Sequence, residues 1–139
     1  MERPEPWFYP QDKVPNFTDG EPDDCSDVQL AVFQLANVRL EIVQPGKKKN
    51  AFKDAIDKHG EGLQHISFIV PDRHEANQSL QKLGMPQPYH IGYWPEGTYA
   101  FVNSRDHLGI EVNIKTDDNN SRKQKEVLAD KNAHKKDLV

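Results

Sequence analysis

The chain has 139 residues and a formal net charge of −4, with 35% hydrophobic and 29% charged residues. This length suits one domain around a single core, and the scattered basic residues give no reason to expect a nucleic-acid partner. No apolar run approaches the roughly 20 residues that a membrane-spanning helix needs, and the start MERPEPWFYP does not have the layout of a secretion signal. Cys25 is the only cysteine, which excludes an intramolecular disulfide and fits a cytoplasmic protein.

The N-terminal part, residues 1–27, is rich in proline and acidic residues. Proline fixes φ and removes a backbone donor, so a helix is not expected there. We predict an irregular N-terminal segment, with an edge strand near residues 7–14 as its only regular element.

The next segments carry a β pattern followed by a helical one. VQLAVFQL (28–35) and VRLEIVQP (38–45) alternate in part between apolar and polar residues, and a turn-compatible Ala-Asn pair separates them, so they predict a hairpin. Residues 47–62 place their apolar residues on one helical face and have Gly60 near the end, which predicts a short amphipathic helix.

Residues 63–114 predict a strand, a helix and three further strands. LQHISFIV (63–70) has the apolar content of a buried strand, and the helix after it begins with Asp72 and Glu75, spaced as in a capping box. Three more β-rich segments follow, at 89–94, 98–104 and 108–114. Residues 115–139 have almost no apolar side chains, so we expect a polar, flexible tail.

Three ionisable residues lie within apolar strand patterns. His65 shares a predicted strand face with Ser67, and Glu41 and Glu111 each lie between two aliphatic residues. Unpaired buried carboxylates are costly, so three such residues suggest a common metal site with nitrogen and oxygen ligands. Two alternatives stay open: a hydrogen-bonded core histidine, and glutamates that face solvent on a one-sided sheet.

Aromatic and histidine residues give weaker signals. We predict that three aromatic side chains line a substrate pocket, although aromatic residues at strand spacing are more often core: Trp94, Tyr99 and Phe101. His90 lies in a predicted strand and could line a cavity, but a surface position is the expectation.

The segments HGEGLQHISFIVPD and GTYAFVNSRDHLGIEVNI resemble the second module of the vicinal oxygen chelate superfamily, which includes glyoxalase I, methylmalonyl-CoA epimerase, extradiol dioxygenases and bleomycin-resistance proteins. VQLAVFQLANVRLEIVQPG resembles the last two strands of the first module. The resemblance is closest to the glyoxalase I and epimerase branch. It implies an α+β fold in which paired βαβββ modules form a curled mixed sheet around a central cavity.

By this resemblance, the glyoxalase-like domain spans 28–114, with 28–46 as the remainder of module one, 47–62 as a linker helix and 63–114 as module two. The opening strand and helix of module one are missing. Members of the superfamily take metal ligands from the first and last strands of each module. Carried over by position, three residues match: Glu41, His65 and Glu111. A fourth ligand position falls on the missing strand.

The resemblance implies a divalent-metal-dependent lyase or isomerase that moves a proton alpha to a carbonyl through a metal-bound enediolate. The metal would be zinc, nickel, cobalt, iron or manganese, and either Glu111 or Glu41 would be the base. The substrate would be a small molecule, such as the glutathione hemithioacetal of methylglyoxal or a 2-methyl-branched acyl-CoA. The alternative is a non-catalytic ligand-binding protein of the resistance type, or an inactive truncated homologue. A cytoplasmic homodimer is the expected assembly, without a membrane or nucleic-acid partner.

Overall fold

The computed structural model describes residues 7–8, 15–94, 97–117 and 135. The chain divides into two compact units, of which unit 1 comprises residues 1–14 and 24–60, and unit 2 comprises residues 15–23 and 61–139. Each unit is therefore built from two separate stretches of sequence.

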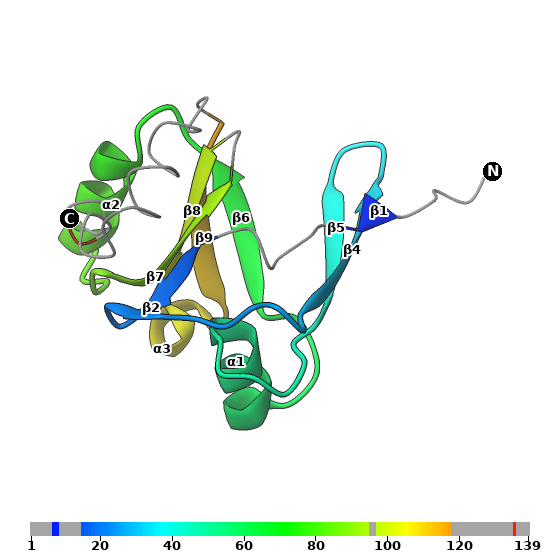
Figure 1. The fold of residues 1–139 in the computed structure, drawn as a ribbon. Coiled ribbons are helices and arrows are strands. Elements are labelled where there is room, and N and C mark those ends of the chain that lie inside the picture. The colour runs from blue at the N-terminus through cyan, green and yellow to red at the C-terminus, as the bar shows by residue number, and fades with distance from the viewer. Residues whose placement is uncertain (1–6, 9–14, 95–96, 118–134, 136–139) are drawn as a thin grey trace. The chain divides into compact units, whose positions relative to one another are not determined.

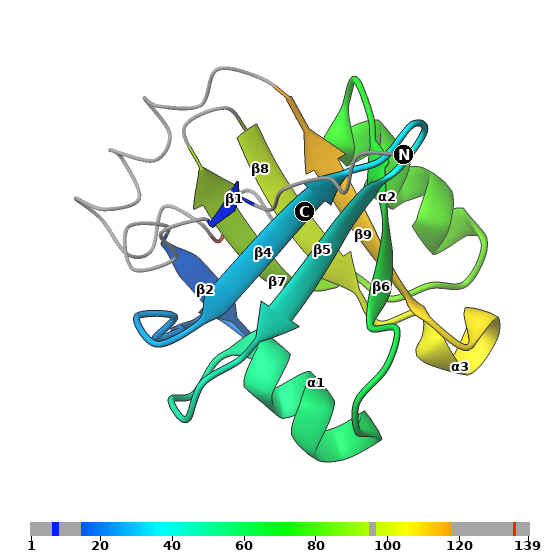
Figure 2. The same cartoon turned by 90° about the vertical axis from the view of Figure 1, so that its right-hand side faces the viewer.

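Unit 1 contains a three-stranded antiparallel sheet and one helix (Figure 2). The strands lie in the order β1-β4-β5 and are β1 (Trp7–Phe8), β4 (Gln29–Gln34) and β5 (Arg39–Gln44). β4 and β5 form the predicted hairpin, in a register that places Phe33 opposite Leu40. β1 pairs with β4 at the sheet edge, where a strand is expected from the sequence, although residues 9–14 lie outside the described part of the chain.

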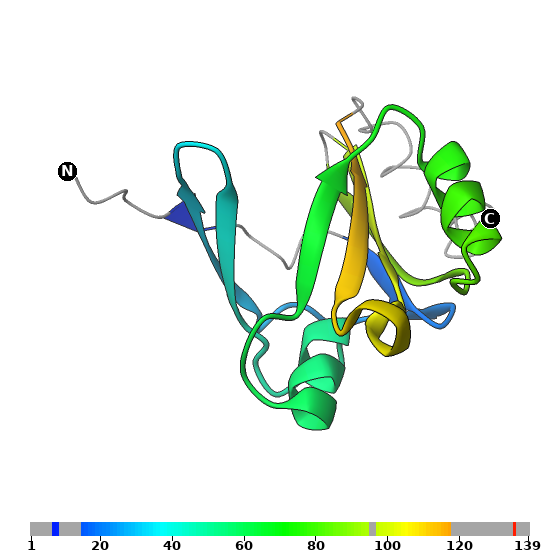
Figure 3. The ribbon, with the colours of Figure 1, turned by 180° about the vertical axis from the view of Figure 1, so that it is seen from behind.

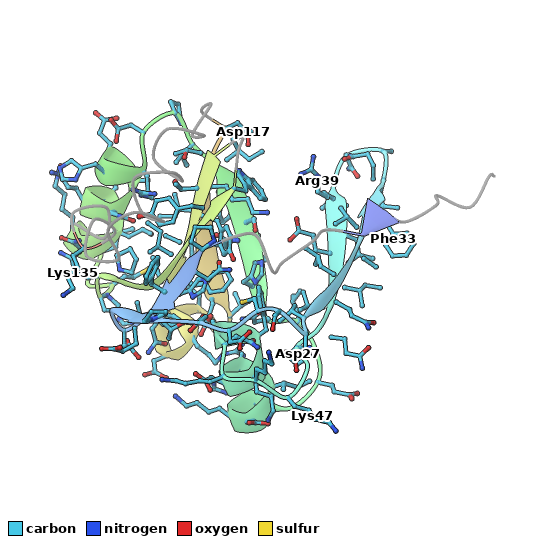
Figure 4. All side chains as sticks on the ribbon, in the orientation of Figure 1. Asp27, Phe33, Arg39, Lys47, Asp117 and Lys135 are labelled. Carbon is cyan, nitrogen blue, oxygen red and sulfur yellow. The ribbon has the colours of Figure 1, made fainter. Side chains whose placement is uncertain are left out.

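The hairpin of unit 1 has one apolar face, because residues directly opposite each other in a sheet share a face. The residues of this face are Ala31, Phe33 and Leu35 from β4 and its end, and Val38, Leu40 and Ile42 from β5 and its start. Val38, Leu40 and Ile42 are 56%, 45% and 55% exposed. Arg39 lies on the other face, and Figure 4 shows Arg39 and Phe33 on opposite sides of the hairpin.

Helix α1 (Ala51–His59) begins at a fully buried asparagine, Asn50. Its side-chain oxygen accepts a hydrogen bond from the N–H of Lys53 at 2.9 Å. Its Nδ2 donates to the carbonyl oxygens of Pro45 and Lys48, each at 3.0 Å. Asn50 thus joins the helix to the end of the hairpin, and the predicted linker helix is confirmed.

Unit 2 is a six-stranded mixed sheet with helix α2 on one face (Figure 1). Its elements in chain order are β2 (Asn16–Thr18), β3 (Glu21–Pro22), β6 (His65–Ile69), α2 (Arg73–Lys82), β7 (Pro88–Trp94), β8 (Gly97–Val102), α3 (Arg105–Leu108) and β9 (Glu111–Thr116). The strands lie in the order β3-β2-β7-β8-β9-β6, with β6 parallel to β9 and the other neighbours antiparallel. The predicted βαβββ succession within 63–114 is therefore confirmed, with the short helix α3 added before its last strand.

Helix α2 covers the apolar face of this sheet, as seen from behind in Figure 3. It begins at Asp72, whose side chain accepts from the N–H of Glu75 at 3.0 Å, as the capping pattern predicts. Ala76 and Leu80 are four residues apart and so share one helix face. They pack, together with Val70, against a buried cluster of Met85, Val102, Val112 and Ile114.

The N-terminal segment is more regular than its sequence suggests. β2 pairs with β7 and places Phe17 opposite Ile91. These two residues and Tyr93 form a second buried cluster, with exposed fractions of 3%, 0% and 0%. A strand of three residues has little β pattern of its own, so its place depends on this non-local packing.

β6 lies at the edge of the sheet, and this corrects the expectation of a buried strand. Among the described residues β9 is its only neighbour, and Ile66, Phe68 and Ile69 are exposed. The sheet is also open, with β3 and β6 at its two ends, whereas the sequence predicts a sheet curled around a central cavity. Closure requires the two end strands to pair, and here four strands separate them.

Within the described residues, no helix has the length and apolar character needed to cross a membrane. Lys115 and Thr116 extend β9, although the sequence pattern assigns them to the tail. Residues 118–134 and 136–139, which make up most of the predicted tail, lie outside the described part of the chain.

Removing the cap of α1 is expected to destabilise the protein more than removing the cap of α2. Asp72→Ala removes one exposed cap hydrogen bond, at a cost of about 1 kcal/mol. Asn50→Ala also leaves two carbonyl oxygens without their donor, so we expect a loss of roughly 2–3 kcal/mol. Urea denaturation followed by circular dichroism measures both losses, and equal values would contradict the buried role of Asn50.

Candidate functional site

The sheet face of unit 2 opposite α2 carries polar and aromatic side chains. We call it the polar face. Two rows of paired residues cross it: Thr18, His90, Phe101, Asn113 and Ser67 in one row, and Asn16, Gly92, Tyr99, Lys115 and Ile69 in the next. The members from β2, β7, β8 and β9 are all buried. Buried polar side chains need hydrogen-bond partners, so this face is where unit 2 could bind a ligand.

His65 and Glu111 lie at one end of the polar face. They are direct partners in the parallel pair of β6 and β9, so both side chains project from the same face. Glu111 is buried and His65 is half-buried. The centroids of the His65 and Phe101 rings are 4.8 Å apart, and His65 Nδ1 lies 3.2 Å from Gln64 Oε1.

A β-bulge brings Tyr89 to Glu111. The register of β7 against β8 shifts between Pro88 and His90, and an extra residue of this kind re-aims a side chain. The Tyr89 hydroxyl donates to Glu111 Oε2 at 2.7 Å. Burial raises the pKa of Tyr89 far above its ordinary value, and the hydrogen bond to the Glu111 carboxylate raises it further. The phenol therefore stays protonated and remains a donor to Glu111.

His90 is fully buried, which corrects the expected surface position. Its Nδ1 lies 2.9 Å from Thr18 Oγ1 and 3.4 Å from Asp23 Oδ2. The Thr18 hydroxyl donates its single hydrogen to Asp23 at 2.8 Å, so it accepts from the Nδ1–H of His90. A neutral His90 then presents Nε2 as an acceptor, and this atom has no partner among the described residues. The ring is stacked on Phe101 with centroids 4.7 Å apart.

The three aromatic residues predicted to line a pocket all lie on the polar face. The ring centroid of Tyr99 is 5.6 Å from that of Phe101 and 6.0 Å from that of Trp94. The Tyr99 hydroxyl donates to Asn16 Oδ1, and Lys115 Nζ lies 4.8 Å from the Trp94 ring centroid. Their common location agrees with the sequence-based grouping, while contact with a substrate stays a prediction.

The predicted ligand set is divided between the units. Glu41 lies on β5 of unit 1, half-buried and opposite Val32, whereas His65 and Glu111 belong to unit 2. Across the described residues, no group of three or more His, Cys, Asp or Glu side chains could hold a metal ion. His65 and Glu111 offer one nitrogen and one oxygen donor, one fewer than the three protein ligands of a typical catalytic site. The described residues thus do not complete a metal site, and the three-residue set stays a prediction.

Sequence reasoning missed the residues around His90. Thr18 and Asp23 belong to the segment that was expected to be irregular, and their distance in sequence from His90 hides the contact. The alternation in YHIGYW does carry a signal, because it places His90 and Trp94 on one strand face.

Comparison of sequences gives one distant relative. No protein-family model matches the chain. The uncharacterized protein YqjC of Bacillus subtilis is 28% identical over 92 residues, which cover 63% of this chain and 64% of YqjC. The chain therefore spans less than two thirds of that relative's length.

Comparison of structures shows a shared fold. Hypothetical protein BH1468 from Bacillus halodurans superposes with a TM-score of 0.51 and 22% identity, over 64% of this chain and 66% of that protein. Methylmalonyl-CoA epimerase in complex with methylmalonyl-CoA gives a TM-score of 0.51 and 19% identity, over 64% of this chain and 67% of the epimerase. A structure of the epimerase from Streptomyces coelicolor, in complex with 2-nitronate-propionyl-CoA, gives 0.51 and 20% over the same shares. The resemblance read from the sequence is confirmed as a likeness of fold.

Tyr89→Phe is expected to lower the free energy of unfolding by roughly 1.5–3 kcal/mol, because it removes a donor from a buried carboxylate. In a Glu111→Gln background the same change should cost about 1 kcal/mol, since the acceptor is then neutral. Urea denaturation of the four proteins measures the difference. If Tyr89→Phe costs the same in both backgrounds, the hydroxyl does not depend on the Glu111 charge.

Tyr89 also predicts a pH dependence of stability. Its pKa in the folded protein is raised above the ordinary value of 10.0, so the unfolded chain loses this proton first as the pH rises. The contribution of Tyr89 is therefore complete below pH 10.0 and is lost progressively above it. The unfolding free energy of the wild type should fall more steeply above this pH than that of Tyr89→Phe. Parallel curves for the two proteins would contradict the buried phenol.

Proposed function

We propose that the polar face of unit 2 binds a carbonyl compound such as an acyl thioester, and that Glu111 transfers the proton on the carbon next to the carbonyl. One observation carries this proposal: Glu111 is buried, accepts a hydrogen bond from Tyr89, and lies directly opposite His65. The shared fold with methylmalonyl-CoA epimerase, whose structure holds methylmalonyl-CoA, supports the choice of substrate class.

Glu111 has the chemistry and the fixed position that such a proton transfer needs. A carboxylate can take a proton alpha to a carbonyl and return it on either side. Tyr89 binds one carboxylate oxygen, and the backbone N–H of Glu111 donates to the Gln64 carbonyl at 3.3 Å. Side chain and main chain are thus both held, and a held base loses less entropy when the substrate binds.

His65 has a supporting role next to Glu111. Its imidazole lies beside the carboxylate in the sheet and can donate a hydrogen bond to a carbonyl oxygen. A zinc, nickel, cobalt, iron or manganese ion would act as a Lewis acid when bound, with His65 and Glu111 as two of its ligands. Glu41, the third ligand predicted from sequence, belongs to unit 1, and we base the role of Glu111 on unit 2 alone.

A second candidate function is non-catalytic binding of a small ligand. Two observations favour it. The described residues hold no group of three metal-binding side chains, and two deeply buried polar atoms on the polar face have no partner there, His90 Nε2 and Asn113 Oδ1. A ligand with polar groups would satisfy both atoms.

Deuterium exchange tests the proposed proton transfer. Wild-type protein incubated with methylmalonyl-CoA in D₂O should incorporate deuterium at the alpha carbon faster than the protein-free solution, as followed by mass spectrometry. Glu111→Gln should lower this rate by about 10²-fold or more, the usual contribution of a general base. Glu75→Gln, which changes an exposed carboxylate on α2, is the matched control and should leave the rate unchanged.

Equal exchange rates for the wild type and Glu111→Gln would remove Glu111 from the reaction. Absence of exchange, combined with saturable binding of the acyl-CoA in calorimetry, would favour the second candidate.

Metal content provides a separate test of His65. Elemental analysis of the purified wild type should find a near-stoichiometric divalent metal, and His65→Ala should lose most of it. No metal in the wild type, even after incubation with nickel, zinc or cobalt, would contradict the metal-dependent form of the proposal and leave metal-free proton transfer or ligand binding.

A further inference from the structure

The outer edge of β5 in unit 1 combines an unpaired strand with an exposed apolar row. In the described part of the chain, β5 pairs only with β4. Val38, Leu40 and Ile42 project from one face of this strand and are exposed. The last hairpin of unit 2 has a different environment, because its second strand, β9, is flanked by β8 on one side and β6 on the other. An open, apolar strand edge is a template for a further strand.

The hairpin register shows which backbone groups face this edge. The N–H of Leu35 donates to the carbonyl of Val38 at 3.0 Å, so Val38 belongs to a hydrogen-bonded pair. In an antiparallel ladder such pairs alternate with non-hydrogen-bonded ones. Val38, Leu40 and Ile42 therefore direct their N–H and C=O groups toward β4. Arg39 and Glu41 direct theirs toward the open edge.

We propose that a second copy of this chain pairs with β5 through an antiparallel β5–β5 contact, with the two-fold axis at Leu40. The segment VRLEI (38–42) is complementary to itself in this arrangement. Leu40 faces Leu40 of the second copy, Arg39 faces Glu41 of the second copy, and Val38 faces Ile42 of the second copy. The two Arg–Glu pairs are also the pairs whose backbone groups face outward, so each can form two interchain hydrogen bonds.

Charge selects this register over its neighbours. Residues that pair directly must both direct their backbone groups outward, so the axis must pass through a residue and not between two. An axis at Arg39 or at Glu41 places two like charges opposite each other, which is destabilising. An axis at Ile42 leaves Glu41 opposite an apolar residue and Arg39 opposite Pro45, which has no N–H. Only the axis at Leu40 pairs opposite charges on one face and apolar side chains on the other.

The contact involves one short strand from each copy, so the interface is small and the dimer should depend on concentration. The arrangement also gives Glu41 a role different from the metal ligand predicted from sequence, because its carboxylate faces a guanidinium of the second copy. Loss of the dimer and loss of metal are measured separately, so the two roles are distinguishable.

Charge exchange provides a stringent test, with mass followed by sedimentation velocity over a range of protein concentrations. The wild type should change from one chain to two as its concentration rises. Arg39→Glu makes both charged positions negative and Glu41→Arg makes both positive, so each variant alone should dissociate roughly tenfold or more readily. An equimolar mixture of the two variants should restore the dimer, because each position then faces the opposite charge. The double variant Arg39→Glu/Glu41→Arg should also dimerise, since the exchange keeps the pairs complementary.

Lys58→Glu is the matched control, because it makes the same change of charge at an exposed residue of α1 and should dimerise like the wild type. Circular dichroism checks that each variant is folded, and the mixture tests the pairing even if one variant is less stable. The proposal is overturned if the wild type stays monomeric at every concentration. It is equally overturned if the single variants dimerise as tightly as the wild type, or if their mixture remains monomeric while the wild type forms dimers.

Discussion

The parallel pairing of β6 with β9 is the constraint on which the candidate site depends. Side chains alternate along a strand, so a slip of one residue would move His65 to the α2 face and bring Ile66 to the polar face. Only one neighbouring strand holds β6 in the described structure, yet its register is fixed at both ends and in the middle. The Glu111 N–H donates to the Gln64 carbonyl, the Val70 N–H donates to the Lys115 carbonyl at 2.9 Å, and Asn113 Nδ2 donates to Ser67 Oγ at 2.9 Å.

The polar face is unusual for the inside of a small protein, since burying a polar group is costly unless it finds a partner. Most of these groups do find one, and the partners come from irregular features of the chain. A bulge in β7 brings Tyr89 to Glu111, and the short strand β2 brings Thr18 to His90. Gly92 leaves the space in which the Tyr99 ring lies, because a Cβ there would come within 2.2 Å of a ring carbon. Proteins that keep such an arrangement commonly use it to bind or to react.

Local patterns were sufficient to predict the parts of the fold that local energetics determine. The cap at Asp72, the hairpin of β4 and β5 and the βαβββ succession all follow from neighbouring residues, and all are present. The β2 strand could not be predicted, because three residues carry no periodicity and Phe17 is buried by contacts far along the chain. The edge position of β6 was missed for a related reason. An apolar strand sequence does not reveal how many neighbours the strand will have.

The candidate site divides in the same way. Alternation places His65 and Glu111 on strands, and the family resemblance places them together, which the register of β6 and β9 agrees with. Tyr89 and His90 reach the polar face through a bulge and through a distant strand, and neither leaves a sequence signal that single-residue periodicity can detect. The role of Glu41 depends on more than one unit's structure and stays a prediction.

The order of the chain has a consequence for how the protein folds. Residues 24–60 of unit 1 are inserted between β2 and the rest of unit 2, so Thr18 meets His90 only after 72 further residues have been synthesised. On the ribosome, β2 leaves the exit tunnel with no strand to join, while the hairpin of unit 1 can already close by local contacts. Docking of β2 onto β7 closes a long loop at an entropic cost that increases slowly with length. We expect the aspartate, threonine and histidine of this network to stay hydrated until that late step.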